Sequence, residues 1–179
     1  MLERFADPGG GFFDTADDHE RLVTRPKDVQ DNAVPSGNAM ATLVLLRLAA
    51  WTGDSACRAA AERAIRTVLP YAERYPTGFA QWLSAMDLAL ADAVEIAVAG
   101  EPRDAATRAL LEPVATGFRP NQVLAVSGTP DASAVPLLHG RVSIDGLPTA
   151  YLCRQFTCRL PVTDAAALRG QLEEPASAA

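Results

Sequence analysis

The sequence of 179 residues has little of what marks membrane, secreted or nucleic-acid-binding proteins. Its longest strongly apolar stretch, from Ala39 to Trp51, contains Arg47 and is shorter than the ~20 residues needed to cross a bilayer. The N-terminus lacks the basic and apolar regions of a secretory signal, which favours the cytoplasm. Acidic side chains (22) outnumber basic ones (16), so we expect no attraction to nucleic acid or to an anionic membrane.

Residues for metal and nucleotide chemistry are also scarce. The two histidines, His19 and His139, have no nearby cluster of other ligand-type residues, so no metal site is predicted. No glycine-rich phosphate-binding motif occurs. The segment Gly100-Glu101-Pro102 is a poor phosphate cradle, because its glutamate repels phosphate and its proline lacks an N–H. We therefore expect no cofactor.

Cysteine is limited to three residues, an odd number that suits a reducing environment better than a disulfide framework. Cys153 and Cys158 lie five positions apart, which is neither a CxxC redox motif nor a zinc-binding spacing. On one continuous strand they would point to opposite faces, so a disulfide would require a turn at residues 154–156. Packing in the core is the favoured interpretation, and a thiol redox role stays the alternative.

The sequence does contain strong helix signals after a loop-like segment of 35 residues. Residues 1–35 are rich in Gly, Asp and Pro and predict a loop with a short extended stub. Ser36 is a good N-cap for a helix over 38–51, which Gly53 can end. Apolar residues surround this helix on nearly every side, with Arg47 as its single charge. Such a helix is expected to be buried almost completely.

Two more helices are predicted before residue 92. Asp54 caps a helix to about Tyr75, in which an apolar stripe lies opposite the charged residues Arg58, Glu62 and Arg66. A third helix follows, capped by Thr77 and ending near Ala91; it is apolar nearly all round, with a narrow polar line made of Gln81, Ser84 and Asp87. Three helices cannot cover two buried ones, so we expect further walls from other parts of a longer protein or from a second copy. Self-association follows from this expectation.

Residues 92–173 have the pattern of a small α/β unit. Three buried strands are predicted over 94–99, 123–126 and 149–153. A helix opened by Asp104 and running to Phe118 joins the first two as a parallel pair, so a mainly parallel sheet is expected. Residues 131–139 predict a short helical turn, a helix capped at Thr163-Asp164 runs to Leu172, and 174–179 predict a disordered tail.

Separated motifs along most of the chain carry a resemblance to a known family. They are Gly10-Gly11-Phe12-Phe13-Asp14, Arg25-Pro26-Lys27-Asp28, the segment from Asp31 to Asn38, Gly78-Phe79-Ala80, and the segment from Tyr151 to Cys158. In this order they resemble the C-terminal part of the YyaL-type family of thioredoxin-domain-containing proteins, which includes spermatogenesis-associated protein 20. The resemblance implies a protein several times longer, with a thioredoxin-like domain that this sequence lacks.

The resemblance also implies a fold. In such a protein the thioredoxin-like domain is followed by an (α/α) toroid similar to that of sugar epimerases and six-hairpin glycosidases. The expected fold class is thus α plus α/β, with helices 36–91 from the end of a toroid followed by the small α/β unit at 92–173. The implied full-length protein would bind or modify a small polar or sugar-like ligand. This chain alone is expected to be non-catalytic.

The loop before the first helix carries the main candidate site. In a toroid, loops at the N-termini of inner helices rim the cavity, where helix dipoles favour anionic or hydroxyl-rich ligands. Arg25 and Lys27 would bind such a group, and Asp28 or Asp31 would act as acid or base. Ser36 and Asn38 would orient the ligand, although capping of the helix by Ser36 and a solvated charge network explain the same pattern.

The polar line on the third helix is a second candidate. Gln81 and Asp87 would face the same cavity as the loop, since a buried carboxylate persists only with partners. Alternatively, Asp87 forms a structural ion pair with Arg25 or Lys27. The sequence leaves two alternatives to ligand binding as the function. One is a scaffold that docks a thioredoxin-like domain or another protein, and the other is thiol redox chemistry at Cys153 and Cys158.

Overall fold

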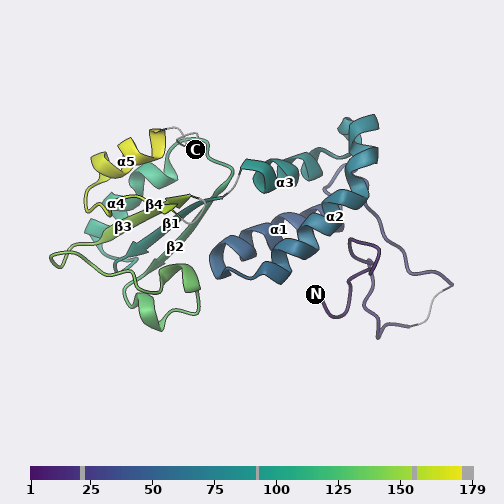
Figure 1. Ribbon diagram of the computed structural model, residues 1–179, viewed down its shortest axis with the longest axis horizontal. Coiled ribbons are helices and arrows are strands. Elements are labelled where there is room, and N and C mark those ends of the chain that lie inside the picture. Colours follow the sequence, from purple (N-terminus) through teal and green to yellow (C-terminus); the bar gives the residue numbers. More distant parts are fainter. Residues whose placement is uncertain (21–22, 92, 155–156, 175–179) are drawn as a thin grey trace. The chain divides into compact units, whose positions relative to one another are not determined.

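The computed structural model describes residues 1–20, 23–91, 93–154 and 157–174 (Figure 1). The chain forms two compact units. The helical unit comprises residues 1–49 and 54–91, and the sheet unit comprises residues 50–53 and 92–179. Five α-helices and a four-stranded mixed sheet lie within the described ranges, so the expected combination of helices with an α/β unit is confirmed. Of the predicted disordered tail, residues 175–179 lie outside the described residues.

Helix α1 spans Gly37–Thr52 and begins where the sequence predicts. The Ser36 hydroxyl accepts a hydrogen bond from the backbone N–H of Ala39 at 3.2 Å and so caps the helix. Its other end is followed by Gly53, whose φ of 72° is a left-handed conformation that glycine adopts without strain. Burial on nearly every side was expected only with further walls from a longer protein or a second copy, and it stays a prediction. One face is buried, whereas Met40, Val44 and Leu48 are exposed.

Helix α2, Ser55–Arg74, begins at the predicted N-cap, because Asp54 Oδ1 accepts a hydrogen bond from Ala56 N at 2.8 Å. Its buried side consists mostly of small residues, which let neighbouring helices approach closely: Cys57, Ala60, Ala61, Ala64, Val68 and Ala72. On the exposed side the expected charge ladder is present, with Arg58 Nε 3.0 Å from Glu62 Oε1. This helix is therefore amphipathic, as the sequence predicts.

Helix α3, Ala80–Ala91, starts later than predicted. Thr77 lies within a short 3₁₀ helix, η1 (Pro76–Gly78), and does not cap α3. Asp31, which is far away in the sequence, accepts a hydrogen bond from Gln81 N through Oδ2 at 2.8 Å. The backbone N–H groups at the start of α3 thus receive a carboxylate from the preceding loop, which local sequence patterns do not reveal.

The sheet contains β1 (Val94–Ala99), β2 (Gln122–Ser127), β3 (Thr149–Arg154) and β4 (Thr157–Cys158), in the order β2-β1-β3-β4. β1 and β2 are parallel, as predicted. β3 runs antiparallel to both β1 and β4, so the expectation of a mainly parallel sheet is wrong. β2 ends beside the end of β1, and residues 128–148 do not return to the opposite end of the sheet. β3 therefore begins where β1 ends, with Thr149 opposite Ala99.

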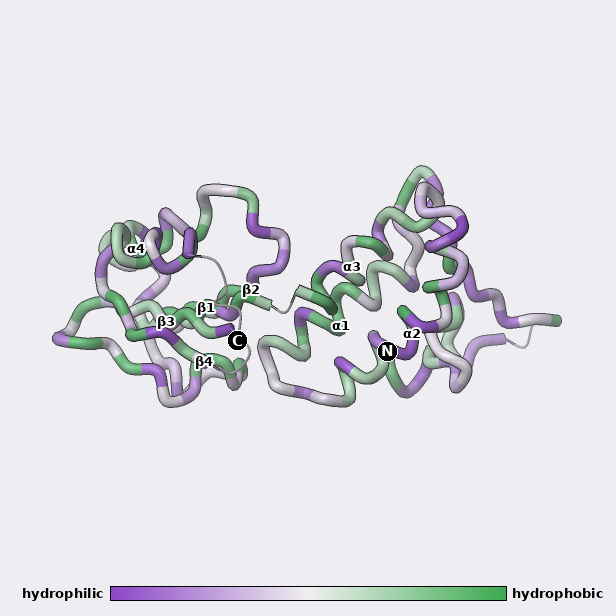
Figure 2. The backbone as a smooth tube through the Cα atoms, turned by 45° about the horizontal axis from the view of Figure 1, so that its top comes forward, coloured by the Kyte–Doolittle hydropathy of each residue, from purple (hydrophilic) through white to green (hydrophobic). Residues whose placement is uncertain are grey.

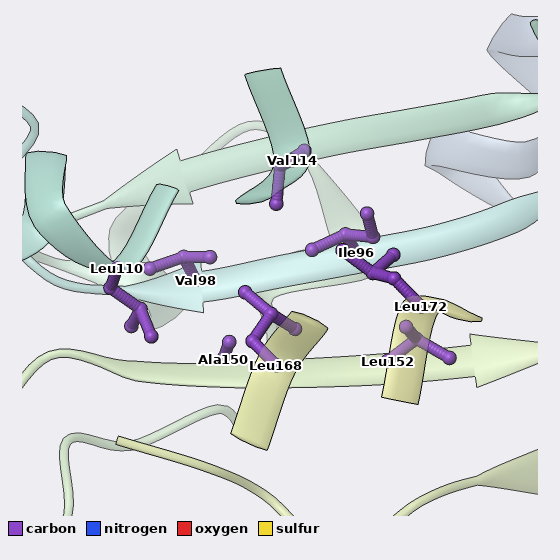
Figure 3. Packing of buried hydrophobic residues seen from close by; sticks show 8 residues of the cluster. All are labelled: Ile96, Val98, Leu110, Val114, Ala150, Leu152, Leu168 and Leu172. Atoms are coloured by element: carbon purple, nitrogen blue, oxygen red, sulfur yellow. The ribbon is translucent and has the colours of Figure 1, made fainter. Parts of the chain in front are cut away.

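One face of the sheet packs against α4 (Ala105–Ala115) and α5 (Ala165–Glu173), as Figure 3 shows. This core contains eight buried residues: Ile96, Val98, Leu110, Val114, Ala150, Leu152, Leu168 and Leu172. Asp164 caps α5 as expected, whereas the side chain of Asp104 forms no capping hydrogen bond to α4. The alternation of side chains along β1 and β3 places every second residue in this core.

The opposite face of the sheet is covered by the long connection between β2 and β3. Leu138 packs here against Ala97, Ala125 and Tyr151. Leu138 belongs to η3 (Pro136–Leu138), which follows η2 (Pro130–Ala132), so the predicted single helical turn is two separate 3₁₀ helices.

Among the described residues, no helix has the length and apolar character that crossing a membrane requires.

Candidate functional site

The candidate loop residues of the helical unit hold the N-terminal segment in place. The guanidinium of Arg25 donates through Nη2 to the carbonyl oxygens of Thr15 at 2.6 Å and Arg4 at 3.2 Å. The same group stacks over the ring of Phe13, 4.0 Å from its centre. An arginine engaged in this way fixes backbone carbonyls of an irregular segment, although Arg25 is exposed to solvent.

Lys27, two residues after Arg25, also holds the N-terminal segment in place. Its ammonium group lies 2.7 Å from Asp7 Oδ2 and donates a hydrogen bond to the Gly10 carbonyl at 2.9 Å. The hydrogen bond from Lys27, helped by one from the Gly9 backbone N–H, lowers the pKa of Asp7. Both charged side chains are largely shielded from solvent. The ion pair thus fastens residues 7–10 to the loop.

Asp28 and Asp31, the two candidate catalytic carboxylates, differ in their surroundings. Asp28 is exposed, and its Oδ1 accepts a hydrogen bond from Gln30 N at 3.1 Å. Asp31 is half-buried and uses both oxygens: Oδ1 accepts from Ser36 N and Oδ2 from Gln81 N, each at 2.8 Å. Asp31 therefore connects the start of α1 with the start of α3, where two helix dipoles favour a negative charge.

The two polar residues at the start of α1 are buried and hydrogen-bonded. The Ser36 hydroxyl donates to the Val29 carbonyl at 3.3 Å in addition to capping the helix. Asn38 Oδ1 accepts from Phe12 N at 2.6 Å, and its Nδ2 donates to the carbonyls of Phe12 and Asp28 at 2.8 and 2.9 Å. Asn38 thus makes three hydrogen bonds to main-chain groups of the loop.

The polar line on α3 is only partly as expected. Gln81 is half-buried, while Ser84 and Asp87 are exposed, so Asp87 is not the buried carboxylate that the sequence suggests. A shallow hollow of about 250 Å³ lies beside the start of this helix. Its lining is Asp31, Asn32, Ala33, Val34, Pro35, Ala80, Gln81 and Ser84.

Of the candidate loop residues and the polar line, Asp31, Gln81 and Ser84 line this hollow. The other six candidates, which are Arg25, Lys27, Asp28, Ser36, Asn38 and Asp87, are absent from its lining. Sequence reasoning missed Trp82, whose indole N–H donates to the Val29 carbonyl at 2.7 Å and so helps to shape the loop behind the hollow. A tryptophan in an apolar helix gives no local signal that its nitrogen binds a loop 53 positions earlier.

The sheet unit holds a second group of reactive side chains, and here the expectation of unpaired cysteines is wrong. Cys153 on β3 and Cys158 on β4 lie directly opposite each other and form a disulfide. The two cysteines lie on different strands, which agrees with the expectation that a disulfide needs the chain to turn between them. Residues 155 and 156 of the expected turn lie outside the described residues. Arg141 Nη2 donates to both sulfurs, at 3.6 Å to Cys153 and 3.3 Å to Cys158.

The third cysteine, Cys57, is a buried free thiol on α2. Burial raises the pKa of this thiol, and the hydrogen bond from its Sγ to the Asp54 carboxylate raises it further. Cys57 is therefore unsuited to nucleophilic chemistry at neutral pH. No group of three or more metal-binding side chains occurs in the part of the chain that the structure describes.

Comparison with curated proteins tests the resemblance carried by the motifs. The chain is 29% identical over 179 residues to spermatogenesis-associated protein 20 from Mus musculus, which covers 95% of this chain and 22% of that protein. The human protein of the same name is 29% identical over 169 residues, covering 90% of this chain and 21% of that protein. The expected family resemblance is confirmed. No model of a protein family matches the sequence.

The match to spermatogenesis-associated protein 20 extends over both units of this chain. The rat protein gives the same identity of 29%, with 93% of this chain and 22% of the relative covered. The chain thus spans about a fifth of the length of the curated relatives that it matches.

Proposed function

We propose that the helical unit is an interaction module that belongs to a larger helical array of the (α/α) toroid type. The observation that carries this proposal is the apolar face of α1. Met40 and Val44 are 42% and 46% exposed, and Leu48 continues their spacing of four residues along the same face. Figure 2 shows apolar colours along much of α1. A soluble helix normally turns such a face towards another element.

A second helix of the unit supports the same function. On α3, Leu83 and Leu90 are 43% and 86% exposed and lie seven residues apart, which places them on one face. Full burial of a wholly exposed side chain of this size contributes about 1.5–3 kcal/mol. All of these side chains except Leu90 are already more than half buried, so covering each of them contributes about half of that or less. Exposed apolar residues in a row mark an interaction surface more often than isolated ones do.

The hydrogen bonding of the candidate site favours a structural role for it. Asp31, Ser36 and Asn38 bind main-chain groups, and Arg25 and Lys27 hold the N-terminal segment. A binding module needs a rigid surface, and these contacts supply it by fixing the start of α1.

We assign the partner that covers the apolar face of α1, for this chain by itself, to a second copy of the chain, because a row of apolar residues on one helix can pack against its own copy about a two-fold axis.

Sedimentation velocity over a range of concentrations tests the proposal. The unaltered chain is expected to self-associate, and the double variant Met40→Gln with Val44→Gln is expected to weaken association by about tenfold or more, since each loses apolar contact area. Leu69→Gln is the matched control, because Leu69 is 40% exposed but lies on α2. A monomer at all concentrations, or equal weakening by the control, would contradict the proposal.

A second candidate function is binding of a small polar, sugar-like ligand in the hollow beside α3. It is favoured by the meeting in one lining of Asp31, predicted as an acid or base, and Gln81, predicted as a ligand-binding residue, from separate segments of the chain. Nuclear magnetic resonance titration with a neutral monosaccharide tests it. Saturable shifts of the Gln81 and Asn32 side-chain amides that disappear in Ser84→Val would support binding, and unchanged spectra would refute it for that ligand.

A further inference from the structure

The disulfide lies at an accessible edge of the sheet unit. β4 is the last strand in the order β2-β1-β3-β4 and contains only Thr157 and Cys158, both exposed. Cys153, directly opposite on β3, is 2% exposed. One sulfur-bearing residue of the pair therefore faces solvent and the other is shielded. This asymmetry lets a reagent from solution reach one end of the S–S bond in preference to the other.

A guanidinium group contacts both sulfurs and is itself held in place. Arg141 Nη2 donates to Cys158 Sγ at 3.3 Å and to Cys153 Sγ at 3.6 Å. Its guanidinium carbon lies 5.0 Å from the ring centre of Tyr151, which is on the same face of β3 as Cys153. The Tyr151 hydroxyl donates to the Val142 carbonyl at 2.7 Å and accepts from Val142 N at 3.2 Å. The residue next to Arg141 is therefore tied to the ring on which Arg141 stacks.

We propose that Cys153 and Cys158 form a reversible thiol–disulfide exchange site, in which a dithiol attacks Cys158 and Arg141 stabilises the thiolate that leaves. Neutral sulfurs gain little from a permanent cation, whereas a thiolate gains a charge-assisted hydrogen bond from it. The positive group is placed where negative charge develops as the bond breaks. This site is independent of the interaction surface proposed for the helical unit.

The exchange proceeds in two balanced steps. A thiolate of the dithiol attacks Cys158 Sγ, the bond between Cys158 and Cys153 breaks, and its electron pair leaves on Cys153 Sγ. The second thiol of the reagent, after losing its proton, attacks the mixed disulfide and releases Cys158 as a thiolate. The dithiol is oxidised to a disulfide, the cysteine pair is reduced by two electrons, and the protons released by the dithiol go to solvent or to the cysteine thiolates.

A purely structural role explains the arrangement less well. The two cysteines are five positions apart on strands that already pair through β3 and β4, so the bond restricts only a short loop of the unfolded chain. A structural bridge also needs no cation on its sulfurs. Three other charged residues lie near the pair: Glu95 is opposite Cys153 on β1, Arg154 lies between the two cysteines in sequence, and Arg159 directly follows Cys158.

The first experiment measures the rate at which dithiothreitol reduces the disulfide of the folded chain, with alkylation by iodoacetamide and intact mass as the readout. Arg141→Gln is expected to slow reduction about tenfold at constant pH, and Arg141→Lys to restore much of the rate. Arg159→Gln is the control, because it removes a neighbouring charge whose partner is Glu174, and it is expected to change the rate less than about twofold.

Loss of structure cannot imitate the expected result, because unfolding would expose the disulfide and speed its reduction. The proposal is overturned if Arg141→Gln reacts as fast as the unaltered chain or faster, or if dithiothreitol reduces the bond only after denaturation.

A second experiment tests which sulfur is attacked. In Cys153→Ser the exposed Cys158 is expected to form a mixed disulfide with oxidised glutathione at least about ten times faster than Cys153 does in Cys158→Ser. Circular dichroism confirms that both variants are folded. Equal rates, or faster reaction at Cys153, would overturn attack at Cys158.

Discussion

Asn38, in the first turn of α1, hydrogen-bonds both main-chain groups of Phe12 through its side-chain amide, at 2.6 and 2.8 Å. The amide takes the place of a neighbouring strand for Phe12, which also forms an isolated antiparallel bridge to Ala6. Phe12 is buried, so without this partner its N–H and C=O would be shielded from water and unpaired. One amide thus allows an irregular N-terminal segment to contribute to the core.

Replacement of Asn38 by alanine is expected to lower the free energy of unfolding of the helical unit by about 2–3 kcal/mol, because it leaves buried main-chain groups without partners. Urea unfolding followed by circular dichroism measures this loss. Asn32→Ala is the control, since Asn32 is exposed on the rim of the hollow and is expected to change stability by less than about 0.5 kcal/mol. Equal effects of the two substitutions would show that the Asn38 amide is not a structural clamp.

The two carboxylates Asp28 and Asp31 are expected to respond differently to substitution. Asp31→Ala removes the acceptor for two N–H groups at two helix starts and should destabilise the helical unit by about 1–3 kcal/mol. Asp28→Ala removes one exposed hydrogen bond and should cost about 0.5 kcal/mol or less. Thermal unfolding of both variants gives the comparison. An Asp31 variant as stable as the Asp28 variant would favour a ligand-binding role for Asp31 instead.

Glycine substitutions test how closely the N-terminal segment packs on α2. Gly10 has a φ of 105°, and a Cβ there would lie 2.3 Å from Thr67 Oγ1 and 2.9 Å from the Arg63 carbonyl oxygen. Gly10→Ala is therefore expected to destabilise by about 2 kcal/mol or more. At Gly37, in the first turn of α1, a Cβ would meet nothing within 4 Å, so Gly37→Ala is expected to be neutral or slightly stabilising. Chemical denaturation of the pair provides the measurement.

The regular elements were largely predictable from local signals. Caps at Ser36, Asp54 and Asp164, together with apolar periodicity, locate α1, α2 and α5, and β-branched runs locate β1 to β3. The direction of β3 was not predictable, because it depends on where the long connection returns the chain to the sheet. The sequence pattern of a buried strand is the same for parallel and antiparallel neighbours.

The candidate site was predicted from polar and charged residues close together in the sequence. In the structure these side chains form hydrogen bonds to main-chain groups. Ser36, Asn38 and Asp31 are polar residues beside a buried helix, a pattern that suits both a ligand site and a set of caps. Only coordinates separate the two, because the deciding partners are backbone groups of Phe12 and Gln81, whose side chains give no sign of it. The contact of Arg141 with the cysteine pair was missed because local sequence does not show that side chains 12 and 17 positions apart meet.

The ion pair of Asp7 with Lys27 predicts a specific loss of stability in acid. Lys27 and the Gly9 N–H lower the pKa of Asp7 in the folded chain, below the value of about 3.9 for an unperturbed aspartate. The pair therefore contributes its full stabilisation above the unfolded pKa and loses it as the pH falls through the lower folded pKa.

Asp7→Asn should reduce the free energy of unfolding by about 1 kcal/mol at pH 7, and the difference from the unaltered chain should shrink below about pH 4. Asp17→Asn, at a more exposed pair with Arg4, is the control and should show a smaller difference at pH 7. Urea unfolding at a series of pH values measures both, and a difference for Asp7→Asn that persists unchanged at pH 2 would show that its cause is not the charge of the carboxylate.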